Sequence, residues 1–364
     1  MKILLLGEYS NVHNTLAKGL RELGHQVTVA SDGDGWKDYP RDIDLKRDPS
    51  GRLSFLWRLA KALPGMRGYD IVQVINPMFL ELKAERILPI YRYLRRHNRK
   101  MVMGSFGMDY YWVSVNTWQR PLRYSDFNFG DNPRTDIEAE RYRKEWTGTP
   151  KQKLSETIAH DCDGIPACLY EYWATYNQVS QLRHKMRFIP LPIVMPSIYH
   201  TSFYGGPLKL FVGISRDRSA YKGTDIMLRA AQALKEKYPD RLELRIANGV
   251  PFDEYQRMMD GSDAILDQLY SYTPSMNSLL AMSKGIIDIG GGEPENYSIL
   301  GEEELRPIIN VLPDEQSVYD QLEQLILNPE RIPELKRQSV EYIKRHHDYI
   351  KVARQYEQFY SELL

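Results

Sequence analysis

The chain has 364 residues, of which 42% are hydrophobic and 26% are charged. This length exceeds one ordinary hydrophobic core and predicts two domains, and the composition is that of a globular protein. Lys plus Arg and Asp plus Glu both number 48, so no excess of positive charge favours nucleic acid as a partner. No apolar stretch has the length of a membrane span, and the apolar run at the N-terminus is too short for a secretory signal. We therefore expect a cytoplasmic protein.

The first half alternates short apolar runs with segments of helical periodicity. Strands are predicted at 3–6, 27–30, 69–76 and 100–104, and helices at 15–23 and about 81–96. A strand, a helix and a parallel strand make a βαβ unit, so the first domain is predicted to be doubly wound α/β. Between about 116 and 154 the periodicity fails and aromatic and charged residues are dense, which predicts a long irregular insertion of functional use.

The second half repeats the α/β pattern. Strands are predicted at 208–213, 242–247, 264–266 and 285–290, with a helix at 224–238 and further helices from Val311 onward. Proline and glycine residues around 204–207 break the pattern between the halves. The sequence therefore predicts a first domain over residues 1–198 and a second α/β domain over residues 199–344.

The loop after the first strand of the second domain carries Arg216, Arg218 and Lys222 beside a predicted helix start. Ligands of parallel sheets bind at the carboxyl ends of the strands, where this loop lies. Guanidinium groups, an ammonium group and helix N-terminal amides are the groups that hold a diphosphate. The loop is predicted to be a diphosphate clamp. The alternative is a solvated, charged loop.

Two further segments of the second domain lie at the carboxyl ends of strands. Backbone amides near Ser275, Met276 and Asn277, at the start of a predicted helix, suit a second contact with an anion. Glu293 and Glu295 follow a glycine run, where carboxylates can accept hydrogen bonds from ribose or sugar hydroxyls. The alternative for the glutamates is a flexible surface turn.

The order of these parts resembles the GT-B glycosyltransferases of family 4, most specifically at Tyr221-Lys222-Gly223-Thr224-Asp225 and Ala281-Met282-Ser283-Lys284-Gly285. The resemblance covers nearly the whole chain. It implies two Rossmann-like domains facing a cleft, with a C-terminal helix of about 345–364 packed back on the first domain. It also implies a nucleoside diphosphate sugar donor, gripped by Lys222 and by Arg216, with Arg218 as the rival for the arginine.

The sequence departs from this family at its glutamate pair. In the family, the second glutamate holds the donor ribose and the first contacts the donor sugar. The matching positions hold Leu280 and Tyr272, neither of which has a carboxylate. Glu293 and Glu295 are the candidates to replace the pair, with Tyr272 beside the donor sugar or ribose. The absence of the pair leaves retaining and inverting outcomes both open.

In the first domain the resemblance implies that acceptor-side and catalytic groups lie at the strand ends. Glu8 and Asn14 in the first loop are the acceptor-side candidates, and His13 and Asp109 are the catalytic candidates. Asp109 is placed to orient or deprotonate an acceptor hydroxyl. The alternatives are a helix N-cap for Asp109 and a hydrogen-bonded loop histidine for His13.

The expected function is transfer of a sugar to a hydroxyl of a glycan or lipid-linked acceptor, in polysaccharide or glycoconjugate biosynthesis, with retention of configuration and with neither a metal nor another cofactor. A non-catalytic nucleotide or glycan binder and a nucleotide-sugar epimerase are the alternatives.

Residues 53–63 predict an amphipathic helix with basic residues around it, and residues 92–100 hold a second basic cluster. Both suit contact with an anionic membrane surface, and the alternative is a core-facing helix with a solvated basic face.

Overall fold

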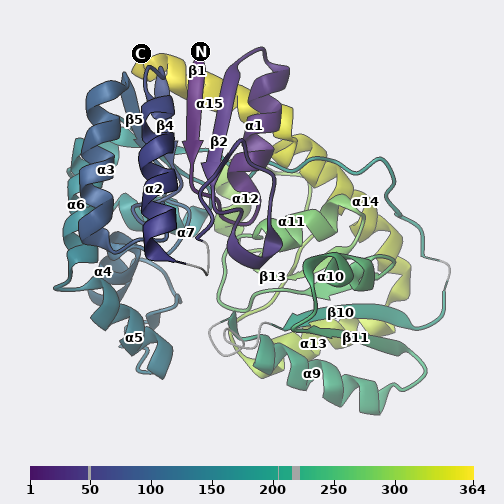
Figure 1. Ribbon diagram of the computed structural model, residues 1–364. Helices are drawn as coiled ribbons and strands as arrows, with labels where there is room; N and C mark the ends of the chain where they lie inside the picture. Colours follow the sequence, from purple (N-terminus) through teal and green to yellow (C-terminus); the bar gives the residue numbers. More distant parts are fainter. Residues whose placement is uncertain (48–50, 204, 215–221) are drawn as a thin grey trace. The chain divides into compact units, whose positions relative to one another are not determined.

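The computed structural model describes residues 1–47, 51–203, 205–214 and 222–364, which form two compact units (Figure 1). Unit 1 comprises Met1–Arg123, Phe127–Pro192 and Tyr349–Leu364. Unit 2 comprises Tyr124–Asp126 and Ile193–Asp348. The short segment Tyr124–Asp126, expected in the first domain, therefore packs with the second half of the chain.

Unit 1 is built on a parallel sheet in the order β3-β2-β1-β4-β5. Its strands are β1 Lys2–Leu6, β2 Gln26–Ser31, β3 Ile43–Asp44, β4 Ile71–Val74 and β5 Lys100–Met103. The strand order reverses between β1 and β4, which is the doubly wound arrangement. Residues 3–6 of β1 are at most 1% exposed, because helices cover both faces of such a sheet. Isolated parallel bridges beyond β5 connect it to the parallel pair β8 (Ile165–Ala167) and β9 (Met186–Phe188).

Helices surround this sheet and include the last helix of the chain. They are α1 Val12–Glu22, α2 Arg52–Ala62, α3 Ala84–His97, α4 Tyr110–Trp118, α5 Ile137–Trp146, α6 Pro150–Asp161, α7 Tyr170–Tyr176 and α15 Tyr349–Leu363, with 3-10 turns at Gly35–Lys37, Leu63–Met66 and Arg183–Lys185. Helix α15 packs on α1 at Gly19, where an added Cβ would lie 2.6 Å from Ala353 Cβ. Glycine is what permits this close approach of the two helices.

The expected irregular insertion is shorter than the sequence suggested. Helices α5 and α6 occupy most of its second half, and a small antiparallel pair, β6 (Asn128–Phe129) and β7 (Asn132–Pro133), lies before them. Among the residues of α5, only Ala139 and Trp146 are buried. Too few apolar side chains face inward for the helical period to show in the sequence.

Unit 2 contains a second parallel sheet, in the order β11-β10-β12-β13-β14. Its strands are β10 Leu208–Ile214, β11 Leu242–Asn248, β12 Ala264–Leu266, β13 Ile287–Gly290 and β14 Ile309–Asn310. Its helices are α9 Thr224–Lys237, α10 Phe252–Met259, α11 Met276–Ser283, α12 Pro294–Leu300, α13 Glu315–Leu327 and α14 Ile332–Tyr342, with a 3-10 turn at Pro329–Arg331 and a π turn at Ile343–His347.

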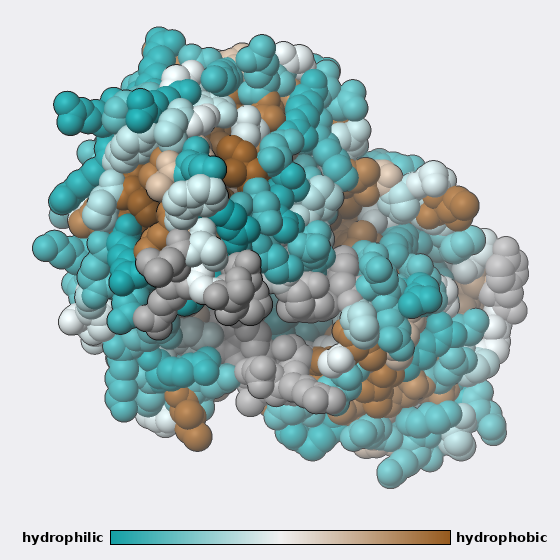
Figure 2. Space-filling model, in the orientation of Figure 1, coloured by the Kyte–Doolittle hydropathy of each residue, from teal (hydrophilic) through white to brown (hydrophobic). Residues whose placement is uncertain are grey.

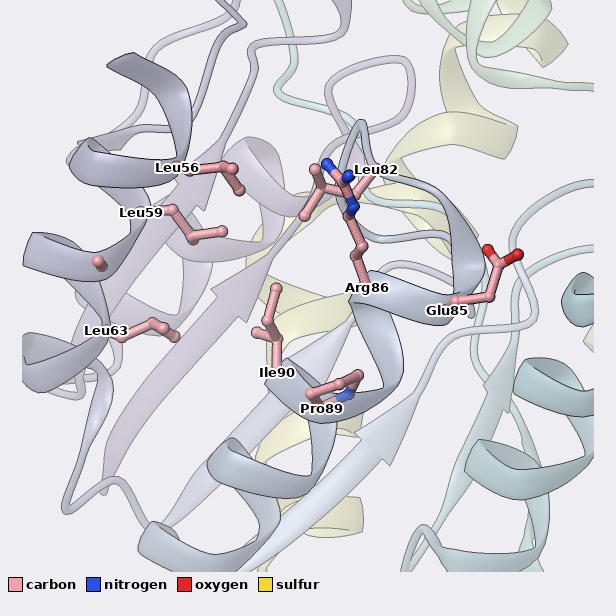
Figure 3. A pocket seen from close by; sticks show the side chains of 9 residues that line it. Leu56, Leu59, Leu63, Leu82, Glu85, Arg86, Pro89 and Ile90 are labelled. Carbon is pink, nitrogen blue, oxygen red and sulfur yellow. The ribbon is translucent and has the colours of Figure 1, made fainter. Parts of the chain in front are cut away.

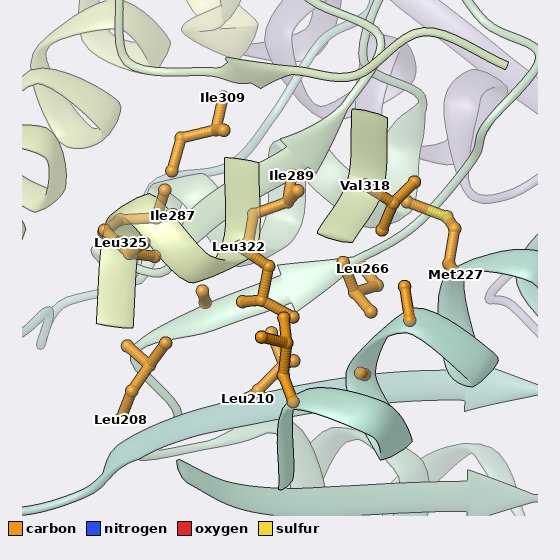
Figure 4. Packing of buried hydrophobic residues seen from close by; sticks show 14 of the residues in the cluster. Leu208, Leu210, Met227, Leu266, Ile287, Ile289, Ile309, Val318, Leu322 and Leu325 are labelled. Carbon is orange, nitrogen blue, oxygen red and sulfur yellow. The ribbon is translucent and has the colours of Figure 1, made fainter. Parts of the chain in front are cut away.

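Alternating side chains of β10 supply two hydrophobic clusters in unit 2. Leu210 and Val212 point to one face and join residues of β12, β13, α9 and α13, as Figure 4 shows for the side chains around Leu322. Phe211 points to the other face and packs with Ile265 and Ala281. The sheet is thus buried on both faces, and its functional side chains can reach solvent only at the strand ends.

None of the helices in the described part of the chain is long and apolar enough to cross a membrane.

Candidate donor and acceptor sites

The clamp predicted after β10 is only partly described by the structure. Arg216 and Arg218 lie outside the described residues. Lys222 is half-buried, and its carbonyl accepts a 2.9 Å hydrogen bond from the amide of Leu269, just after β12. Gly223 has a φ of 70° and would place a Cβ 2.6 Å from Leu269 Cβ, so only glycine suits this position. These contacts fix the backbone of Lys222 at the carboxyl edge of the sheet. The Lys222 amine makes no ion pair with any described residue.

The predicted anion contact at Ser275 lies at the start of α11. Ser275 is the N-cap residue, and its side chain makes no capping hydrogen bond to the amides of the first turn. Gln268 Nε2 donates a 2.9 Å hydrogen bond to Ser275 Oγ. The loop after β12 thus contacts Lys222 through Leu269 and α11 through Gln268. This loop therefore lies against both predicted diphosphate contacts, Lys222 and the start of α11.

A carboxylate that the sequence analysis missed lies at this helix end. Asp267 is 6% exposed and accepts hydrogen bonds from three side chains of the first turn of α11. These come from Ser275 Oγ at 2.9 Å, Asn277 Nδ2 at 3.0 Å and Ser278 Oγ at 2.7 Å. Asn277 Oδ1 in turn accepts from Tyr255. The signal in the sequence is an acidic residue directly after a buried strand, followed by hydroxyl and amide residues at the next helix start.

Ser278 also lies 3.0 Å from a second carboxyl group, Asp288 Oδ1 in β13. A hydroxyl has one proton and can donate to only one of the two groups. Asp288 is fully buried, its Oδ2 has no hydrogen-bond partner among the described residues, and burial together with the charge of Asp267 raises its pKa well above the usual range. If Asp288 holds a proton, as the direction of its pKa favours, it donates to Ser278 and leaves the hydroxyl proton of Ser278 for Asp267.

The predicted sugar-side residues Tyr272 and Glu293 lie together in unit 2. The amide of Glu293 donates to the carbonyl of Tyr272 at 3.1 Å. Glu293 is 5% exposed, and its Oε1 accepts a 2.7 Å hydrogen bond from the hydroxyl of Tyr124. The ring of Tyr124 packs on that of Tyr272 with centroids 4.6 Å apart. A buried carboxylate thus lies beside Tyr272.

The glycine run before Glu293 is held against neighbouring backbone. An added Cβ on Gly291 would lie 2.2 Å from the carbonyl oxygen of Ser271, and one on Gly292 would lie 2.7 Å from Ile308. The run is therefore a packed turn and differs from the flexible alternative. Glu295 is half-buried in the first turn of α12.

In unit 1, Glu8 binds the start of α1. Its carboxyl group is 2% exposed and accepts from the amides of His13 at 3.2 Å and Asn14 at 2.8 Å. Burial, and to a smaller extent the charge of Asp34, raises the pKa of Glu8 to about 8. Asn14 Nδ2 donates to Asn11. The acceptor-side candidates are thus adjacent at the carboxyl end of β1.

His13 is fully buried, with a hydrogen-bond partner at each ring nitrogen. Nδ1 lies 2.8 Å from the carbonyl of Gly7, and Nε2 lies 3.0 Å from Gln73 Nε2. A carbonyl only accepts and an amide nitrogen only donates, so His13 is the neutral tautomer with the proton on Nδ1. The Oε1 of Gln73 accepts from Tyr360 at 2.8 Å. Burial lowers the pKa of His13 to about 4. These are the contacts of the hydrogen-bonded alternative, and a catalytic role for His13 stays a prediction.

Asp109 is the N-cap of α4, as its alternative interpretation held. Oδ1 accepts from the amide of Trp112 at 2.8 Å, and Oδ2 accepts from the hydroxyl of Tyr176. Asp109 is fully buried, and burial raises its pKa to about 6 despite these hydrogen bonds. A carboxyl group that titrates near neutrality can exchange a proton, but here it is occupied by the helix start. Its catalytic role is a prediction.

The fold of the chain is identified by comparison with known structures. By sequence, the chain matches no family model and no curated protein. Sucrose-phosphate synthase from Thermosynechococcus elongatus is similar with a TM-score of 0.65 at 12% identity, over 100% of this chain and 99% of that one. HepE from Anabaena, in complex with UDP-glucose, is similar with a TM-score of 0.62 at 13% identity, over 100% of both chains. The chain has the GT-B glycosyltransferase fold.

A plant enzyme domain has the same GT-B architecture. The catalytic domain of starch synthase IV from Arabidopsis thaliana, bound to ADP and acarbose, is similar with a TM-score of 0.57 at 11% identity, over 100% of this chain and 99% of that one. The two parallel five-stranded sheets of the GT-B fold confirm the predicted fold class. Identities of 11–13% show the fold alone, so the activity rests on the site.

Proposed function

We propose that the chain is a glycosyltransferase that moves a sugar from a nucleoside diphosphate sugar to a hydroxyl of a glycan or lipid-linked acceptor, in polysaccharide or glycoconjugate biosynthesis in the cytoplasm. The observation that carries the proposal is the loop after β12. Its residues Leu269 and Gln268 contact the backbone of Lys222 and Ser275 at the start of α11, where Ser275 leaves the first-turn amides without a side-chain cap of its own. UDP-glucose and ADP in the similar structures support a nucleoside diphosphate as the ligand of this region.

Positive charge has a specific task in this site. A departing diphosphate gains negative charge, and a fixed cation stabilises it as it forms. The negative charge of Asp267 beside α11 offsets the positive end of the helix dipole. The helix end alone is then a weak anion site, and binding depends on Lys222 and on an arginine, Arg216 or Arg218. Because these cations carry out the charge neutralisation, the proposed reaction needs no metal.

We assign the missing carboxylate of the family pair to Glu293. It lies against the backbone of Tyr272 and is oriented by Tyr124, so it can accept a hydrogen bond from a hydroxyl of the donor sugar or ribose. Glu295 is the second candidate. A carboxylate on the donor side is compatible with retention of configuration, which is the outcome we propose.

On the acceptor side, we propose that Glu8 and Asn14 contact the incoming hydroxyl compound. Glu8 carries a proton over much of the neutral range, so it can donate as well as accept a hydrogen bond. His13 and Asp109 remain the catalytic candidates of the sequence. Their observed contacts support the walls of this site, because His13 holds β1 against β4 and Asp109 holds the start of α4.

The test is a thermal-shift screen of nucleoside diphosphates and their sugars, against the wild type and Lys222→Ala. A ligand that binds only the native state raises Tm as its concentration exceeds Kd. We expect one nucleotide series to raise Tm, and Lys222→Ala to weaken its binding about tenfold to a hundredfold, the value of a hydrogen bond to a charged group. Lys237→Ala is the matched control, because it removes the same charge at the far end of α9. No shift with any nucleotide contradicts the proposal.

The two alternatives are separated by product analysis. A non-catalytic binder shows the thermal shift without transfer or hydrolysis of the donor. This alternative is favoured by one observation, the absence of carboxylates at positions 272 and 280. An epimerase yields a changed sugar with its nucleotide still attached, whereas a transferase releases free nucleoside diphosphate.

A further inference from the structure

Positive charge is concentrated in one stretch of unit 1. The chain has a net charge of zero, yet residues 52–100 hold 11 basic and 3 acidic residues, a net charge of +8. This stretch forms α2, β4 and α3. Such an excess of positive charge attracts negatively charged partners.

The same stretch has an apolar hollow at its surface. A pocket of about 370 Å³ lies between α2 and α3, and Figure 3 shows leucines of α2 facing Ile90 and Arg86 of α3 across it. The aliphatic lining comprises Leu56, Leu59, Leu63, Leu82 and Ile90. Figure 2 shows a brown area where Figure 1 draws these helices, bordered by hydrophilic residues. Contiguous apolar surface framed by polar residues marks an interaction site.

The outer side of α2 combines an aromatic ring with cations. Phe55 and Leu59 are buried, whereas Leu56 is 36% and Trp57 60% exposed. The amine of Lys61 lies 3.5 Å from the centroid of the Trp57 ring. An exposed tryptophan beside basic residues is typical of proteins that lie in the membrane interface, where the ring sits at the level of the headgroups and the cations meet phosphate.

Not all of the basic residues are free to meet a partner. Arg95 pairs with Asp163 at 2.6 Å and with Asp161 at 3.4 Å, and Lys100 pairs with Asp163 at 3.4 Å. The second basic cluster expected from the sequence is therefore partly neutralised within the fold. In contrast, Lys61 and Arg86 make no ion pair with any described residue, and both are exposed at the hollow or beside it.

We propose that this α2–α3 surface, comprising Leu56, Trp57, Lys61, Leu63, Arg86 and Ile90, docks unit 1 on an anionic phospholipid bilayer. Phosphate headgroups neutralise Lys61 and Arg86, while Trp57 and Leu56 enter the interface beside the aliphatic hollow. An acidic protein or a nucleic acid would satisfy the cations, but it would leave the aliphatic lining without an apolar partner. An anionic bilayer satisfies both, the cations through its phosphate headgroups and the aliphatic lining through its acyl region. Docking does not depend on the proposed transferase activity, although it would bring the chain to a lipid-linked acceptor.

The experiment is cosedimentation of the full chain, without substrates, with vesicles of phosphatidylcholine alone or mixed with phosphatidylglycerol. We expect binding to the anionic vesicles only, weakened by salt. The double variant Lys61→Glu with Arg86→Glu should lose at least about tenfold in vesicle affinity, since each basic residue near an anionic surface contributes about fivefold. The matched control is Lys18→Glu with Arg354→Glu, which makes the same charge change at exposed positions of α1 and α15 in the same unit. The control should bind as the wild type does.

Tryptophan fluorescence supplies a second measurement. Anionic vesicles should shift the emission of the wild type to shorter wavelength as Trp57 leaves water, and Trp57→Phe should abolish that shift. Equal binding by the double variant and the wild type overturns the proposal, as does an equal loss in the control. Binding of soluble polyglutamate without binding of anionic vesicles also overturns it and identifies an acidic macromolecule as the partner. Because no sugar donor is present, failure here leaves the proposed transferase function untouched.

Discussion

The hydroxyl of Tyr124 donates a 2.7 Å hydrogen bond to Glu293 Oε1, although 169 residues separate the two in the chain. Tyr124 belongs to a three-residue segment of the first half that packs within unit 2. The bond orients the carboxylate that we propose contacts the donor.

We expect Tyr124→Phe to lower kcat/KM about tenfold, because Glu293 loses one orienting hydrogen bond while the ring still packs on Tyr272. Glu293→Gln should lower kcat further, since its amide oxygen can still accept from Tyr124 but the charge is gone. Steady-state kinetics with Tm measured in parallel check both variants. Tyr238→Phe is the matched control, because it removes another hydroxyl that donates to a glutamate of unit 2, Glu323. Unchanged kinetics of Glu293→Gln would exclude Glu293 from the site.

The Asp267 and Asp288 network predicts an asymmetry between two similar substitutions. Asp288→Asn should cost little stability, because burial favours the neutral form of Asp288 and an amide can still donate to Ser278. Asp267→Asn should lower the free energy of unfolding by about 1–3 kcal/mol, because the single oxygen of an amide cannot accept all three hydrogen bonds that the carboxylate accepts. Urea unfolding of both variants measures the difference. A larger loss in Asp288→Asn would reverse our assignment of the proton.

Glu8 predicts a pH dependence of stability. Its pKa rises from 4.5 in an unfolded chain to about 8 in the fold, so the native state holds a proton that the unfolded state releases. The free energy of unfolding then falls as pH rises between these values, by up to about 1.4 kcal/mol per pH unit. Glu8→Gln cannot titrate and should show a shallower slope from pH 5 to 8, whatever its absolute stability. Urea unfolding at several pH values tests this. Glu22→Gln, an exposed position on α1, should keep the wild-type slope.

Transfer activity should survive a chelator. In the proposed site, Lys222 and an arginine stabilise the departing diphosphate, the task that a divalent cation performs in metal-dependent transferases. Release of nucleoside diphosphate, assayed with and without EDTA, should be equal. Complete loss in EDTA with recovery in Mg²⁺ or Mn²⁺ would show that the cations of the chain are insufficient.

The central strands of both sheets could be predicted from sequence because a parallel strand buried on both faces is a continuous apolar run, as in residues 3–6 and 210–212. Helix α5 was missed because its surface is mostly solvated. The placement of Lys222, Ser275 and Glu293 at the carboxyl edge of the second sheet could be predicted, because the local sequence pattern shows where each strand ends. The partner of Glu293 did not, because a contact between Tyr124 and a residue so far along the chain depends on tertiary packing. Gln73 in an apolar strand signals a buried partner, but only the fold identifies it as His13.

The contact of α15 with Gly19 has a consequence for the order of folding. Unit 1 needs the segment Tyr349–Leu364 to cover α1, whereas every part of unit 2 precedes that segment. During synthesis from the N-terminus, unit 2 can complete its core while α1 still exposes the groove that receives α15. The half of the molecule that is made first is therefore the half that finishes last, and a ribosome-stalled chain lacking α15 should present a structured unit 2 beside an incomplete unit 1.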